Sequence, residues 1–163
     1  MDDFRISVRR LLGGFLAGFF ATLIFHQLTL MVLWRAGLAP FTPFSMAATR
    51  PFGIPALFSL AFWGGIWGII FVLVEGRFPN RRGYWPAAFL FGAIFPSLIA
   101  LLVVLPIKGK EIGGGWHHPP LLLTAFLING AWGVGTGIFL KLLSALGIIN
   151  NSPYRNNTEK PKS

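Results

Sequence analysis

Four long apolar stretches constrain the fold of this chain more than any other feature. They cover residues 11–34, 54–74, 86–107 and 120–140, and none carries a charged side chain before its end. Each is close to the roughly 20 residues that a helix needs to cross the hydrocarbon core of a bilayer. Only 12% of the residues are charged, against about 25% in soluble domains. The sequence therefore predicts an all-α membrane protein with four transmembrane helices.

Basic residues flank these stretches and predict their orientation. Ten of the 14 Lys and Arg residues precede the first stretch, join the second to the third, or follow the fourth. The alternate connections hold Arg35, Arg50, Lys108 and Lys110. The positive-inside rule then places both termini in the cytoplasm, which we expect for a protein of the bacterial inner membrane. The first stretch exceeds the apolar core of a signal peptide and lacks an A-x-A-like site, so we expect it to stay as an anchor.

The stretches divide the chain into three parts. We expect a basic cytoplasmic amino terminus over residues 1–10, a single transmembrane domain over 11–146, and a polar tail over 147–163 that is disordered. The net charge of the chain is +9, but its Lys and Arg residues flank the apolar stretches and form no stripe on a soluble face. No nucleic acid partner is therefore expected. The predicted partner is the lipid bilayer, whose anionic head groups suit the basic flanks.

An internal similarity links the two halves of the chain. Aligning residues 55–68 with 120–133, without a gap, pairs five similar residues: Pro55, Ser59, Gly65, Trp67 and Gly68 with Pro120, Thr124, Gly130, Trp132 and Gly133. The first and third stretches match less closely, Gly18 falling on Gly92 and, after one inserted residue, Thr22 on Ser97. This pattern favours two tandem helical hairpins in parallel orientation. The alternative is that two Gly- and Trp-rich membrane helices resemble each other by composition.

Glycines at helical spacing predict where the helices pack. Association in lipid depends on small residues that let backbones approach. We interpret six such glycines as packing surfaces, within the chain or between copies of it: Gly14, Gly18, Gly64, Gly68, Gly133 and Gly137.

A polar pair interrupts the first stretch. The step of four through Gly14, Gly18 and Thr22 lands on His26, and Gln27 follows about 100° around the helix. Asn129 lies deep in the fourth stretch and should face another helix. Ionisable groups within a membrane raise a functional-site hypothesis, so the candidate polar site comprises six residues: His26, Gln27, Asn129, Arg50, His117 and His118. For His26, a structural hydrogen-bonding role and a functional role both stay open.

Catalytic and metal-binding functions have little support in the sequence. His26, His117 and His118 are the three histidines that a zinc site would need, but no carboxylate lies within a stretch to support them. No G-x-S-x-G, H-E-x-x-H or P-loop motif is present. We therefore expect no enzyme activity, no metal and no cofactor.

The opening GFLAGFFATLIFHQ, the paired G-x-W-G and the small size resemble compact four-span bacterial inner-membrane proteins of uncharacterised families. The resemblance covers about residues 11–146, implies the four-helix fold, and carries no functional residues with it. Two functions follow as hypotheses. One is a structural or accessory membrane component that associates with copies of itself or with another membrane protein. The other is a small transporter or channel lined by His26, Gln27 and Asn129.

Overall fold

The computed structural model describes residues 7–107 and 119–149. Two of the four spans are interrupted by a π-helical turn. The first span consists of α1 (Val8–Ala21), a π-turn (Thr22–His26) and α2 (Gln27–Arg35). The second is α3 (Ala56–Val74), the third is α4 (Tyr84–Ile99), a π-turn (Ala100–Val104) and α5 (Leu105–Ile107), and the fourth is α6 (Pro119–Ala145).

The prediction of an all-α protein with four spans is confirmed. Four helical segments are long and apolar enough to cross a membrane, and the described residues contain no β-strand. The segments are Val8–Arg35, Ala56–Arg77, Arg81–Val104 and Leu121–Ala145, so the predicted limits differ by a few residues at most ends. The fourth helix continues past the predicted end to Ala145, and within this extension the Lys141 ammonium lies over the rings of Tyr84 and Trp85.

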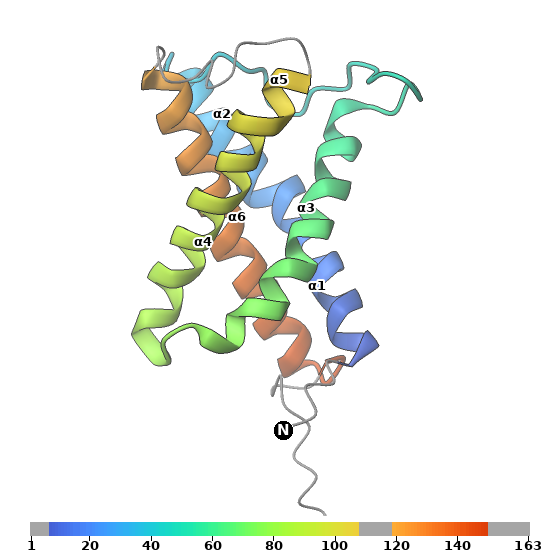
Figure 1. Ribbon diagram of the computed structural model, residues 1–163, viewed down its shortest axis with the longest axis vertical. Coiled ribbons are helices and arrows are strands. Elements are labelled where there is room, and N and C mark those ends of the chain that lie inside the picture. Colours follow the sequence, from blue (N-terminus) through green and yellow to red (C-terminus); the bar gives the residue numbers. More distant parts are fainter. Residues whose placement is uncertain (1–6, 108–118, 150–163) are drawn as a thin grey trace, which may run out of the picture.

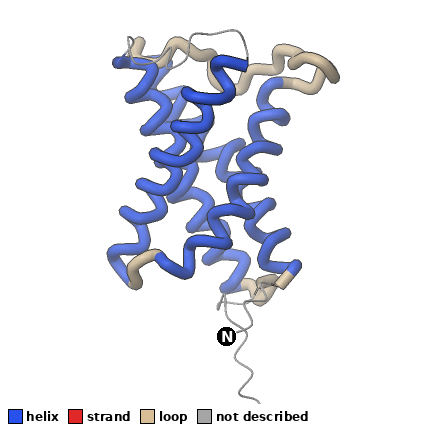
Figure 2. Tube along the Cα trace, in the orientation of Figure 1, coloured by secondary structure: helices blue, strands red, loops and turns tan. Residues whose placement is uncertain are grey.

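The bundle is built from two helix pairs that meet along α1 and α6. Helix α3 packs on α1, α4 packs on α6, and the two pairs join where α1 and α6 cross (Figures 1 and 2). Helices α3 and α4 touch mainly through aromatic rings, with the centroids of Phe71 and Phe91 5.3 Å apart. Spans two and three are therefore neighbours through their side chains, while the closest backbone packing lies within each pair.

Glycines allow the close approach in both pairs. In the first pair, a Cβ atom on Gly18 would collide with the Gly64 carbonyl oxygen, and one on Gly68 with the Gly14 carbonyl oxygen. In the second pair, a Cβ on Gly133 would collide with the Ala88 carbonyl oxygen. The predicted glycine stripes of these helices are thus buried inside a single chain. Gly137 faces the ring of Tyr84 instead.

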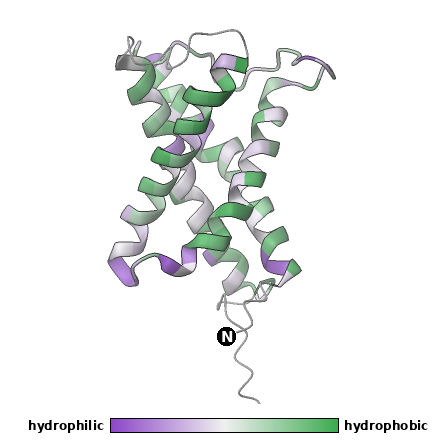
Figure 3. Ribbon diagram, in the orientation of Figure 1, coloured by the Kyte–Doolittle hydropathy of each residue, from purple (hydrophilic) through white to green (hydrophobic). Residues whose placement is uncertain are grey.

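The outer surface of the first span carries large apolar side chains at every fourth position. Exposed residues step along it opposite the glycine stripe: Leu12, Leu16, Phe20, Ile24, Leu28 and Val32. The other spans expose similar side chains, and the outside of the bundle is largely hydrophobic (Figure 3). Such a surface suits lipid tails, whereas the ends of the bundle are more polar.

The carboxyl end of α6 is closed by a glycine in the left-handed region. Gly147 has φ +70°, and the amide of Ile148 bonds the Leu143 carbonyl 3.0 Å away. This turn folds Ile149 onto Gly13, where it is 4% exposed. Ile149, assigned to the polar tail in the sequence analysis, therefore packs against the bundle. The rest of the tail lies outside the described residues.

Candidate functional site

His26 and Gln27 are both buried at the π-turn of the first span. Their exposed fractions are 6% and 3%. The amide of Gln27 bonds the carbonyl of Thr22, five residues earlier, which marks the wider π-helical turn. Because of this wider turn, Gln27 and His26 both lie on the buried face of the helix that carries Thr22. Regular α-helical spacing would have turned Gln27 away from the interior.

Gln27 joins the bundle to the connection between the first two spans. Its side-chain Oε1 accepts a hydrogen bond from the Phe44 amide at 2.7 Å, and its Nε2 lies 3.4 Å from Nδ1 of His26. Phe44 has φ 52°, a strained conformation for a bulky residue, at the point where this bond forms. Gln27 therefore bonds the loop on one side and His26 on the other.

The same connection, residues 36–55, covers this end of the bundle, which we term the loop end (tan at the top of Figure 2). Thr124 of α6 donates a hydrogen bond to the Leu38 carbonyl at 3.2 Å. Ala39 packs beside Leu33 and Ile128 in a small buried apolar cluster. The loop is thus held by side-chain hydrogen bonds from Gln27 of the first span and Thr124 of the fourth, together with backbone hydrogen bonds at its two ends.

Asn129 lies apart from the His26–Gln27 pair, in the interface of α4 and α6. Its Nδ2 donates to Oγ of Ser97 at 3.0 Å, and the Ser97 hydroxyl donates to the Ala125 carbonyl at 3.1 Å. None of the hydrogen bonds among the described residues joins Asn129 to His26 or Gln27. Arg50 is exposed on the loop, and His117 and His118 lie outside the described residues. Among the four candidates that the structure describes, hydrogen bonds therefore join only His26 and Gln27 to each other.

Trp132 fills the space between the two helix pairs. It is 2% exposed, and its Nε1 donates a hydrogen bond to the Gly18 carbonyl at 2.9 Å. Its ring packs edge-on against Phe71 with the centroids 6.4 Å apart. The large indole, fixed by a hydrogen bond across the bundle, leaves a packed centre at this level.

A polar cluster that the sequence analysis did not single out lies at the opposite end, which we term the basic end. Arg10 and Glu75 form an ion pair in which each side chain is 8% exposed. The Tyr84 hydroxyl donates to the other carboxylate oxygen of Glu75 at 3.1 Å. The Lys141 ammonium lies 4.3 Å from the centroid of the Tyr84 ring. Each of the four spans thus supplies one member of this cluster.

The sequence contains one signal for this cluster. Glu75 is the single acidic residue in a connection that carries Arg77, Arg81 and Arg82, and it stands at the end of an apolar stretch on the side where Arg10 ends another. Opposite charges at neighbouring span ends predict an ion pair only when those spans are known to be adjacent. A cavity of about 530 Å³ adjoins the cluster, with Asn80 and Ser144 also in its lining.

The described residues offer no candidate metal site. Among the residues that the structure describes, no group of three or more His, Asp or Glu side chains is placed to hold a metal ion. Two of the three histidines considered for a zinc site fall outside those residues. No known protein family, curated protein or solved structure matches this chain.

Proposed function

We propose that this chain is a structural or accessory component of a bacterial inner membrane. The observation that carries the proposal is that its interior polar groups bind other parts of the same chain. Gln27 holds the loop, Asn129 holds Ser97, and Trp132 closes the centre. Because these interior polar groups already bond within the chain, the protein is suited to act as a scaffold. Such a scaffold would associate through its outer surface with lipid or with another membrane protein.

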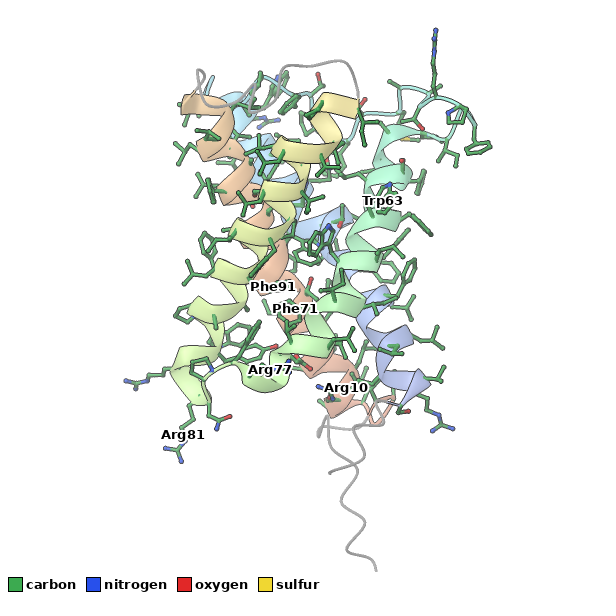
Figure 4. The ribbon with its side chains drawn as sticks, viewed as in Figure 1. Arg10, Trp63, Phe71, Arg77, Arg81 and Phe91 are labelled. Carbon is green, nitrogen blue, oxygen red and sulfur yellow. The ribbon has the colours of Figure 1, made fainter. Side chains whose placement is uncertain are left out.

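The glycine faces do not supply that outer surface. Gly14, Gly18, Gly64 and Gly68 contact one another within the chain, so an oligomer formed through them would require the helix pairs to separate. A homo-oligomer or a complex with another membrane protein would instead use exposed apolar faces, such as the one that carries Trp63, which is 59% exposed (Figure 4).

The proposed orientation has the basic end in the cytoplasm. The described residues at that end include Arg9, Arg10, Arg77, Arg81, Arg82 and Lys141, whereas the loop end carries Arg35 and Arg50. The positive-inside rule supports cytoplasmic termini from this difference.

We also propose that the two helix pairs are tandem repeats in parallel orientation. The support is that residues aligned by sequence make equivalent contacts. Phe15 falls on Phe89 in the same alignment of the first and third stretches. The Phe15 ring covers Gly65, and the Phe89 ring covers Gly130. Thr22 faces Gly64 across the first pair, and Ser97 bonds Asn129 across the second. Composition alone would not reproduce the same partner at each position.

A small transporter or channel is the second candidate. It is favoured by the burial of His26, an ionisable residue, beside a π-turn, because such turns are frequent at functional sites. In that case His26, Gln27 and Asn129 would have to exchange their present partners for a solute or a proton during the transport cycle.

One experiment separates the two candidates. A photo-crosslinking amino acid is placed at Trp63, on the exposed face of α3, and at buried Ala61 as the matched control on the same helix. In parallel, the flux of protons and small solutes is measured in liposomes that contain the wild type or His26→Gln. The scaffold proposal expects one discrete crosslinked product from position 63, none from position 61, and equal flux in both proteins. Flux that is lost in His26→Gln, with no discrete product, would establish the transporter instead.

A further inference from the structure

The cavity at the basic end has the composition of an anion site at a membrane interface. Its volume is about 530 Å³, and all four spans or their ends contribute to its lining. The lining includes two cations, Arg10 and Lys141, against one acid, Glu75. Asn80 and Ser144 add neutral hydrogen-bonding groups, and Phe78 and Leu140 provide apolar wall.

Arg10 and Glu75 form an ion pair with each other, and Lys141 is the second cation in the cavity lining. The Glu75 carboxylate accepts hydrogen bonds from Arg10 and from the Tyr84 hydroxyl. Lys141 instead lies over two ring faces, 4.3 Å from the Tyr84 centroid and 4.4 Å from the Trp85 centroid. Among the described residues, no acceptor lies within hydrogen-bond distance of its ammonium, so its three N–H donors are available to a ligand.

The surroundings point to a phosphate group as the ligand. Arg77 and Arg81 lie at the same end of the bundle as Arg10 (Figure 4), and both are exposed. Tyr84 and Trp85 begin α4, at the level where aromatic residues meet lipid head groups. Basic pockets between transmembrane helices at this depth suit anionic head groups.

We propose that the basic-end cavity binds the phosphate group of an anionic phospholipid, with Lys141 as its direct ligand. The Arg10–Glu75 pair fixes the first and second spans on one side of the cavity, and the two rings hold Lys141 on the other. Asn80 and Ser144 donate to the remaining phosphate oxygens. This site is independent of the structural role proposed above, because it requires only that the bundle lies in a membrane.

The test measures lipid binding to the purified full chain by native mass spectrometry. The probes are dioleoyl-phosphatidylglycerol, dioleoyl-phosphatidylcholine as the zwitterionic control, and inorganic phosphate added as a competitor. Lys141→Gln removes the proposed ligand, and Arg82→Gln removes one positive charge at the same end from a side chain outside the cavity lining. Lys141→Arg retains the charge.

We expect Lys141→Gln to weaken binding of phosphatidylglycerol about tenfold, the effect of one charge-assisted hydrogen bond. Arg82→Gln and Lys141→Arg should stay within about twofold of the wild type, since each keeps a cation at the ligand position that can make a charge-assisted hydrogen bond to phosphate. Competition by inorganic phosphate at constant ionic strength would identify free phosphate as the natural source of the same group; its failure to compete would identify the lipid.

The proposal is overturned if phosphatidylglycerol binds no more tightly than phosphatidylcholine, or if the two Gln variants weaken binding equally. If Lys141→Gln does not fold, Ser144→Leu serves as the second variant, because it fills the cavity without changing its charge. Undiminished lipid binding by Ser144→Leu would equally exclude the cavity as the site.

Discussion

The α1–α3 and α4–α6 interfaces share a close backbone contact, but they differ in the side-chain hydrogen bonds one turn beyond it. In both, a glycine carbonyl or its alanine counterpart lies against a glycine of the partner helix. At the next turn, Thr22 meets Gly64 and its hydroxyl bonds the Gly18 carbonyl of its own helix at 2.9 Å. In the second interface Ser97 bonds across to α6 and receives a bond from Asn129.

This difference separates the requirement for packing from the contribution of polar bonds. Gly64 offers no side chain, so Thr22 bonds within its own helix, and the first interface forms without an interhelical side-chain bond at that level. Asn129 supplies a donor in the second interface. Close backbone contact is therefore common to both pairs, while the polar bond is an addition to one of them.

Bulk introduced at the shared glycines should have the largest effect. Gly68→Val and Gly133→Val place a side chain against a backbone carbonyl, so each should lower the free energy of unfolding by about 2–3 kcal/mol. Thermal unfolding in detergent, followed by circular dichroism, measures this loss. Val32→Phe, which adds bulk on an exposed side chain, should change stability by less than about 0.5 kcal/mol. A large loss in only one of the two glycine variants would break the equivalence of the interfaces.

The two aligned tryptophans should differ by an intermediate amount. Trp132 is buried and bonds the Gly18 carbonyl, whereas Trp67 is partly buried and packs on Phe91 with ring centroids 6.3 Å apart. Trp132→Phe should cost about 1–2 kcal/mol of stability, since it removes both contact area and a hydrogen bond. Trp67→Phe should cost less than about 1 kcal/mol in the same unfolding measurement. Equal costs would mean that the bond to Gly18 adds nothing.

Loss of the hydrogen bond between Asn129 and Ser97 should have the smallest effect on stability. Asn129→Ala is expected to cost about 0.6 kcal/mol, the average for an interhelical side-chain bond in a membrane protein. A double-mutant cycle with Ser97→Ala isolates the pair, because the bond from Ser97 to Ala125 is lost equally in both backgrounds that lack the hydroxyl. A coupling energy of zero would show that the second interface depends on packing alone, as the first does.

The four spans and the glycine contacts follow from local properties of the sequence. Apolar length predicts a span, and the spacing of Gly14 and Gly18 predicts a close face, because both depend on one helix at a time. Gln27 could not be placed in the same way, since the π-turn at Thr22–His26 changes the register of the residues after it. Its bond to Phe44 also depends on the path of a loop that has no regular periodicity.

The basic-end cluster required a different kind of information. The sequence analysis counted Arg10 and Lys141 among the basic residues that flank the spans, and it assigned no role to Glu75. Their contact arises because α1, α3, α4 and α6 bring four span ends together. Which ends meet is decided by the assembly of the bundle, and a single sequence does not contain that arrangement in any local pattern.

The π-turn divides the first span into two α-helical segments, α1 and α2, whose side chains face different neighbours. Residues before Thr22 are placed by the glycine contacts with α3, and residues after His26 are placed by the loop and by α6. If the same residues formed a regular α-helix instead of the π-turn, the side chains of α2 would be rotated by about 100° around the helix axis. The extra residue in the turn thus allows the side chains of α1 to face α3 while those of α2 face the loop and α6.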